Sequence, residues 1–304
     1  ALASRVGTGS ISVFTFASNL EAVPLALIGS SYAVAAFPAL SEASAIEKRD
    51  EFIRILSTGA RHVILWSVVS LGLIAVLRAH IVRVVLGTGA FDWDATRLTA
   101  ALLAVLAVGL VAQGLVLLFS RALYAVRQSW RPLLYQVAGG MLTVILAVVF
   151  LALPAEGLPA TLASFLKVGD VHGAGILLIA FAATLGNLFL ALLSLAALRS
   201  VAPALARTLA RPLLDGSLAA LAGGAAAYVT LALLGGIAPL TTLVSVFTQG
   251  LIAGVVGLTA AAVALAVLEN EEFRIVTGSL GRLVRIPGVR ASALPPSAEE
   301  PIQP

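Results

Sequence analysis

Few residues of this sequence have types and spacings that support chemistry. There is no cysteine, which excludes thiolate metal sites, disulfides and cysteine nucleophiles. The three histidines, His62, His80 and His172, lie far apart, and no two have the spacing of metal ligands. The HExxH, GxSxG and phosphate-loop patterns are also missing. We therefore expect no catalytic residues, no enzyme activity, no cofactor and no bound metal.

The most informative polar residues lie in the first long apolar segment. Ser12, Thr15 and Asn19 are three and four residues apart, so they share one face of a helix. Polar side chains inside a membrane span usually face a cavity or another helix. Pro24 removes a backbone hydrogen bond and allows a bend. The segment is either a bendable helix that faces a substrate or a packed helix whose small polar residues are hydrogen-bonded internally.

Polar residues are sparse in the other apolar segments. Gln113 and Asn187 have side chains that could bond across neighbouring helices. Glu21 is the only acid embedded in an apolar segment, so a self-contained proton relay is poorly supported.

The elements that must position these residues are membrane-spanning helices. The chain is 60% hydrophobic and 11% charged, against about 25% charged in soluble proteins, and its mean hydropathy is +1.05. A span requires about 20 apolar residues. Charge-poor stretches predict seven spans: 9–38, 57–77, 98–120, 132–153, 173–198 and two within the uncharged run 216–268. We also expect a short surface helix at 79–88 and a helix N-cap at Asp92, with Asp94 in the first helical turn.

Basic residues are distributed unequally between the two sides of the membrane. Alternating spans place 14 of the 19 Lys and Arg residues on one side and five on the other: Arg5, Arg78, Arg83, Arg97 and Lys167. Basic loops are typically cytoplasmic, so the C-terminus is predicted to be cytoplasmic and the start of the chain external. This distribution accounts for the +4 net charge, and we expect no nucleic-acid partner. An external start without a signal peptide also favours further spans upstream.

Short motifs along residues 7–200 add a family resemblance. They are GSIS at 9–12, Pro24, FPALS at 37–41, VVLGTGAF at 84–91, SRALYA at 120–125 and HGA at 172–174. Together these motifs resemble those of the MurJ/MviN lipid II flippases. The resemblance implies an all-α, polytopic membrane protein with two lobes of six helices and a terminal pair, of which this chain would be the last seven helices.

The resemblance also implies a division of the chain. Residues 1–200 would form a C-lobe-like bundle, 201–270 the terminal helix pair and 271–304 a cytoplasmic, largely disordered tail. The protein would be a multi-pass protein of the bacterial cytoplasmic membrane. Its partners would be a lipid-linked peptidoglycan precursor, membrane lipids and a missing N-terminal lobe on the same or another chain.

The implied activity is translocation of undecaprenyl-pyrophosphate-linked peptidoglycan precursor, lipid II, by alternating access. Ser12, Thr15 and Asn19 would then line the substrate cavity, and Pro24 would act as the hinge. Arg121 and Arg127 would lie at the cytoplasmic mouth, either to contact the anionic headgroup or as ordinary positive-inside anchors.

Two departures from the family pattern leave alternatives open. Asn19 stands where the family usually has an arginine, and an amide can hydrogen-bond a phosphate without neutralising it. Gln128 and Ser129 replace a usual Asp-Thr pair. The alternatives are a non-transporting membrane scaffold for cell-wall synthesis and a flippase for another polyprenyl-linked glycan.

Overall fold

The computed structural model describes residues 9–87, 93–154, 156–235 and 242–284, with only the backbone described from residue 279. All regular structure in these ranges is helical. The elements are α1 (Ser10–Leu25), η2 (Ala26–Ser30), α2 (Ser31–Ala45), α3 (Arg49–Leu86), α4 (Trp93–Ala125), α5 (Trp130–Leu151), α6 (Leu158–Phe165), α7 (Ile176–Leu198), α8 (Leu205–Thr208), α9 (Ala210–Leu234), α10 (Leu243–Val267) and α11 (Glu271–Val284).

Seven helical runs in the described ranges are long and apolar enough to cross a membrane, which confirms the predicted number of spans. Several extend past a predicted end because their helices continue into flanking polar residues, as in Arg49–Leu86 and Trp93–Ala125, whereas Ile176–Leu198 stays within its predicted range. The seven are Ser10–Ala45, Arg49–Leu86, Trp93–Ala125, Trp130–Leu151, Ile176–Leu198, Leu205–Leu234 and Leu243–Val267.

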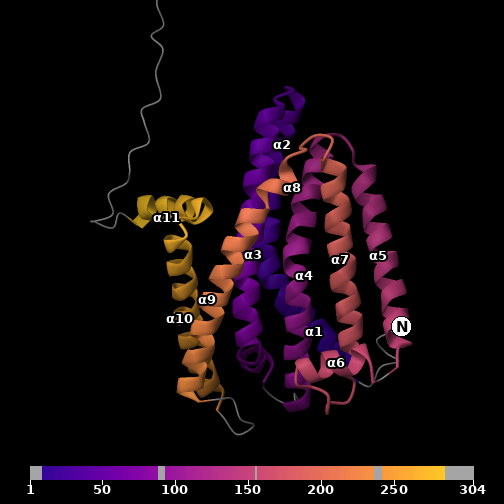
Figure 1. Cartoon of the computed structure of the whole chain (residues 1–304), viewed down its shortest axis with the longest axis vertical. Coiled ribbons are helices and arrows are strands. Elements are labelled where there is room, and N and C mark those ends of the chain that lie inside the picture. Colours follow the sequence, from indigo (N-terminus) through magenta and orange to yellow (C-terminus); the bar gives the residue numbers. More distant parts are fainter. Residues whose placement is uncertain (1–8, 88–92, 155, 236–241, 285–304) are drawn as a thin grey trace, which may run out of the picture.

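The spans form a bundle built around α4 (Figure 1). This helix packs against α1, α2, α3 and α7, while α5 packs on α7 at one flank and the α9–α10 pair packs on α3 at the other. The end of the bundle that carries α8 and α11 is called the basic end here, and the end that carries α6 is called the opposite end.

Among the described residues, buried apolar side chains form three clusters. One joins α1, α4 and α7 around Ala17, Leu102 and Ile176. A second joins α2, α3 and α4 around Leu40 and Phe119, among other residues. The third lies between α3, α9 and α10 and includes Leu65, Val69, Ala219, Ala261 and Leu265. The terminal pair is therefore attached to the rest of the bundle through α3.

Glycines allow close helix crossings, of which one lies in the first span and one in the terminal pair. A Cβ on Gly29 would lie 2.8 Å from the Cα of Gly114, and a Cβ on Gly223 would lie 2.7 Å from the carbonyl oxygen of Gly257. Small residues at such crossings let membrane helices approach closely.

The structure corrects one expectation. The surface helix expected at 79–88 is absent, because α3 continues without a break to Leu86. No Gly or Pro lies between Gly72 and Gly87, and His80 and Val82 are buried against neighbouring helices. The segment from residue 271 begins with helix α11, and the prediction of a largely disordered tail stays a prediction because residues 285–304 lie outside the described ranges. Asp94 lies in the first turn of α4 as predicted, whereas Asp92 falls outside the described residues.

Candidate functional site

The first span changes its helical winding next to Pro24. The α-helix α1 ends at Leu25, and the backbone passes through the π-helical turn η2 before α2 begins at Ser31. The wider turn comes directly after Pro24, which lacks an N–H group and whose ring crowds the turn before it. Ser31 Oγ donates to the carbonyl oxygen of Ala26 at 3.0 Å and so satisfies a backbone group within this turn. The irregularity lies where the sequence predicts a hinge, and π-turns of this kind are frequent at functional sites.

The packed face of α1 carries a buried acid. Glu21 lies on the same side as Val13 and Ala17 and is only 6% exposed. Gln113 Nε2 of α4 donates to Glu21 Oε1 at 2.6 Å. The expectation that Gln113 bonds across helices is therefore confirmed, although its partner was not predicted. This hydrogen bond gives both polar groups a partner in an apolar environment, where an unpaired group is costly.

Two contacts with α4 bracket the hinge. On one side of Pro24, Glu21 is bonded to Gln113. On the other side, Gly29 of η2 lies against Gly114, the next residue of α4. Both ends of the irregular segment are thus held against one turn of a central, regular helix. We call these two contacts the hinge clasps.

The polar face of α1 points away from its packed face. Ser12, Thr15 and Asn19 are all exposed, and their helical spacing places them opposite Val13 and Ala17. Thr15 Oγ1 donates to the carbonyl oxygen of Ile11 at 2.8 Å, a bond within the helix. The structure therefore brings the three residues together on one face, as predicted. Their role in lining a cavity stays a prediction.

Arg121 and Arg127 lie at the basic end of the bundle. The guanidinium of Arg121, on α4, lies over the ring of Phe37 on α2, 5.5 Å from its centroid. Arg127 occupies the turn between α4 and α5, and its φ of 58° is uncommon for a residue other than glycine. Both residues are exposed, like the polar face of α1, but they lie at a different place in the bundle.

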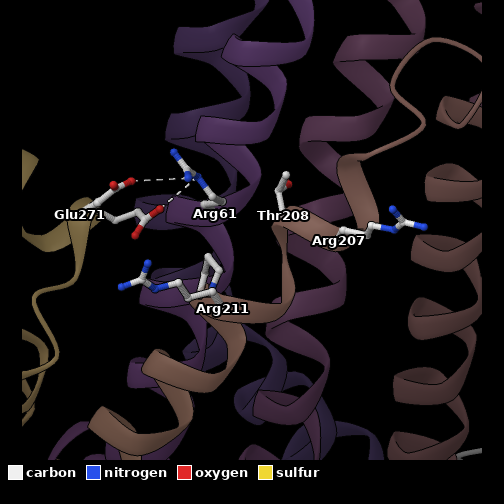
Figure 2. A pocket seen from close by; sticks show the side chains of 7 residues that line it. Arg61, Arg207, Thr208, Arg211 and Glu271 are labelled. Atoms are coloured by element: carbon white, nitrogen blue, oxygen red, sulfur yellow. Dashed lines mark ion pairs between the residues drawn. The ribbon is translucent and has the colours of Figure 1, made fainter.

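The sequence does not predict a cleft that lies at the basic end of the bundle. It has a volume of about 210 Å³ and lies between α3, α8, α9 and α11 (Figure 2). Arg61 of α3 forms ion pairs with Glu272 at 3.0 Å and with Glu271 at 3.7 Å. Arg207 and Arg211 also line the cleft. Only the two adjacent acids that open an amphipathic stretch signal this site in the sequence, because the pairing requires α11 to fold back onto α3.

A second ion pair fastens the opposite end. Arg97 of α4 donates through both terminal nitrogens to the carboxylate of Asp170, each at 2.7 Å. Asp170 lies in the loop between α6 and α7, and these hydrogen bonds lower the pKa of its carboxyl group below the ordinary value. The pair ties the start of α4 to that loop. Sequence reasoning treated Arg97 only as a charge on the external side.

Comparison with known proteins identifies the family to which these helices belong. The family model described as lipid II flippase MurJ matches residues 1–160, more than half of the chain. The chain belongs to the MurJ lipid II flippase family. The match includes the first span, the hinge clasps, Arg121 and Arg127. MurJ proteins are membrane flippases and not catalysts of covalent chemistry.

A solved structure shows how far the fold extends. The structure titled "Lipid II flippase MurJ, inward closed conformation" matches with a TM-score of 0.64 and 21% identity. The match covers 88% of this chain, so the shared MurJ fold continues well past residue 160, but only 50% of the other chain. This chain therefore spans half the length of that flippase. Comparison with curated proteins gives no match.

Proposed function

We propose that this chain supplies the C-terminal half of a lipid II flippase in the bacterial cytoplasmic membrane. It would move undecaprenyl-pyrophosphate-linked peptidoglycan precursor between leaflets by alternating access. The observation that carries the proposal is the exposed polar face of α1, opposite a packed face, in a chain of the MurJ family.

The polar face of α1 requires another part of the protein to shield it from lipid. Asn19 above all would be costly against lipid, because hydrocarbon offers its amide group no partner, whereas the Thr15 hydroxyl already bonds within the helix. A second lobe placed over this face would enclose these side chains in a polar cavity. Hydroxyl and amide groups can hydrogen-bond the phosphates and sugars of a lipid-linked precursor. The missing N-terminal lobe, on the same or another chain, is the partner that this arrangement requires.

The distribution of basic residues indicates which end of the proposed cavity faces the cytoplasm. The excess of basic residues favours a cytoplasmic position for the basic end. Arg121 and Arg127 would then lie where the anionic headgroup arrives, and exposed guanidinium groups attract and bind phosphates. Asn19 supplies hydrogen bonds deeper in the span without a fixed charge that would hold the headgroup there.

The hinge gives the cavity a way to open and close. Pro24 and η2 let the first span bend, while the hinge clasps keep the bend in register with α4. A bend at this point would move the polar face relative to the rest of the bundle. Alternating access requires such a movement around a bound headgroup.

Cysteine accessibility tests the polar face directly, because the chain has no cysteine of its own. We expect Asn19→Cys, in its native membrane, to react with a membrane-impermeant thiol reagent and to be protected by added lipid II. The matched control is Val144→Cys on α5, which is 56% exposed in this chain and faces lipid in the proposal. If Asn19→Cys reacts no faster than Val144→Cys, the cavity assignment is wrong.

Depletion tests the transport function. We expect loss of the protein to trap lipid II in the cytoplasmic leaflet, and Asn19→Arg, which restores the usual family residue, to retain or increase flipping. Normal lipid II export after depletion would favour the non-transporting scaffold. Accumulation of a different polyprenyl-linked glycan would change the substrate but keep the mechanism.

A further inference from the structure

Helix α11 lies across the ends of the spans. It follows α10 after a sharp turn in which Glu269 has a φ of 50° (Figure 1). Asn270 caps the new helix, because its Oδ1 accepts a hydrogen bond from the backbone N–H of Phe273 at 3.0 Å. The Asn270 Nδ2 group donates to Asp215 Oδ2 of α9 at 2.8 Å, in a buried contact. The change of direction is therefore fixed to the terminal pair.

A second attachment holds the start of α11 against α3. Glu272, whose side chain is only 5% exposed, forms its ion pair with Arg61, and Glu271 reaches the same guanidinium (Figure 2). Both acidic charges at the start of the helix are thus paired with a base on the bundle. From this anchor α11 runs outward past the end of α10 (Figure 1).

The apolar face of α11 is turned toward the spans. The Phe273 ring packs beside Trp66, with ring centroids 6.4 Å apart, and joins the apolar cluster between α3, α9 and α10. Val276, one turn further on, is half-buried. In the sequence, Leu280, Leu283 and Val284 fall at the same positions of the helical repeat. Arg274 is exposed, and the sequence adds Arg282 in the same helix.

The orientation of the apolar face of α11 distinguishes between two partners that could cover it, a soluble protein and lipid. A soluble protein partner would require the apolar face to point away from the bundle, into the aqueous phase. Here Phe273, on that face, instead packs against the terminal pair, and the outer side of the same pair carries Val263 and Val267, which are 57% and 76% exposed. Those side chains belong to a span, and the solvent that surrounds a span is lipid.

We propose that α11 is a membrane-surface helix that lies in the headgroup–acyl boundary of the leaflet at the basic end. Its apolar face lies among the upper acyl segments, and its arginines contact the phosphates of anionic phospholipids. Amphipathic helices with basic residues on the polar face bind membranes in this way. The leaflet is the cytoplasmic one if the orientation in the proposed function is correct.

The depth of α11 is measured with the full chain reconstituted into vesicles of equal parts phosphatidylglycerol and phosphatidylcholine. A bimane fluorophore is attached to Val276→Cys, on the apolar face, or to Gly278→Cys, on the other side of the helix. We expect a lipid with a shallow nitroxide to quench the Val276 label several-fold more than aqueous iodide does, and the reverse for the Gly278 label. Equal iodide quenching at both positions would overturn the proposal, as would shielding of the Val276 label from both quenchers.

The contact between the arginines of α11 and lipid phosphates is tested by comparing these vesicles with pure phosphatidylcholine vesicles. We expect Arg274→Gln to reduce, by about half, the gain in nitroxide quenching that phosphatidylglycerol produces, because one arginine–phosphate contact is lost. Arg54→Gln is the matched control, since Arg54 is an exposed arginine at the basic end on α3. An equal loss in both variants, or in neither, would overturn the lipid-phosphate contact. Neither measurement depends on transport, so failure here is distinguishable from failure of the proposed flippase function.

Discussion

The first span and the terminal helix pair solve the problem of crossing a membrane in different ways. The first span contains Pro24 and Pro38, a π-turn, a buried acid and an exposed polar face. The terminal pair is regular α-helix in its described part, and the sequence from 216 to 268 has no charged residue. The first span is therefore suited to bending around a polar substrate, and the pair to a constant shape in contact with lipid.

Close packing of glycines occurs in both regions, but the structures next to the two contacts differ. In the first span, the Gly29–Gly114 contact lies next to the hinge and the Glu21–Gln113 bond. In the terminal pair, the Gly223–Gly257 contact joins two uninterrupted helices. The same substitution should therefore lower stability in both places, while only the first should disturb the polar face.

Bulky residues at these crossings should have the largest effect. Gly29→Leu and Gly257→Leu each place side-chain atoms within 3 Å of another backbone, which costs about 1–3 kcal/mol or more. We expect a lower thermal unfolding midpoint for both in detergent, with Gly140→Leu near wild type because nothing lies within 4 Å of a Cβ there. Only Gly29→Leu should also change thiol accessibility at Asn19→Cys. A similar change in Gly257→Leu would remove the distinction between the two regions.

Loss of the Glu21–Gln113 hinge clasp should have the next largest effect on stability. Glu21→Ala leaves the Gln113 amide without its partner, at a cost of about 1–3 kcal/mol. In a double-mutant cycle, Gln113→Ala should add little once Glu21 is already replaced, because the two changes remove one bond. Thr259→Ala in the terminal pair is the matched control, since the exposed Thr259 Oγ1 donates only within its own helix, to the carbonyl oxygen of Val255 at 2.8 Å. Strictly additive losses for Glu21 and Gln113 would show that their hydrogen bond contributes nothing to stability.

Removing the hinge proline should change the rate of lipid II flipping more than the stability of the fold. Pro24→Ala restores a backbone N–H group and favours a regular helix, so we expect a several-fold slower lipid II flipping with an unchanged or raised unfolding midpoint. Pro38→Ala, in the same span but away from η2, is the control and should slow flipping less. An equal effect of both variants would place the flexibility in the whole span instead of at the π-turn.

These regions also differ in how far the sequence predicts them. Seven spans follow from apolar length, a local property, and the common face of Ser12, Thr15 and Asn19 follows from the helical period. The partner of Gln113 does not, because it depends on α1 lying beside α4. The continuity of α3 past Arg78 and the anchoring of α11 by Arg61 were missed for the same reason. Each depends on contacts between residues far apart in the chain, which a local pattern does not contain.

The smallest effect is expected where α4 is fastened at the opposite end. Because its partner Arg97 lowers the pKa of Asp170 in the folded protein, the pair stabilises the fold above the ordinary carboxyl pKa. This stabilisation is lost as the pH falls through the lowered value. Asp170→Asn should therefore lower the unfolding midpoint slightly at pH 7, and the difference from wild type should vanish in acid. Flipping at pH 7 should barely change, since α4 keeps its packing against α1, α3 and α7. A flipping defect as large as that of Pro24→Ala would mean that α4 moves with the hinge and is not the fixed element against which the first span bends.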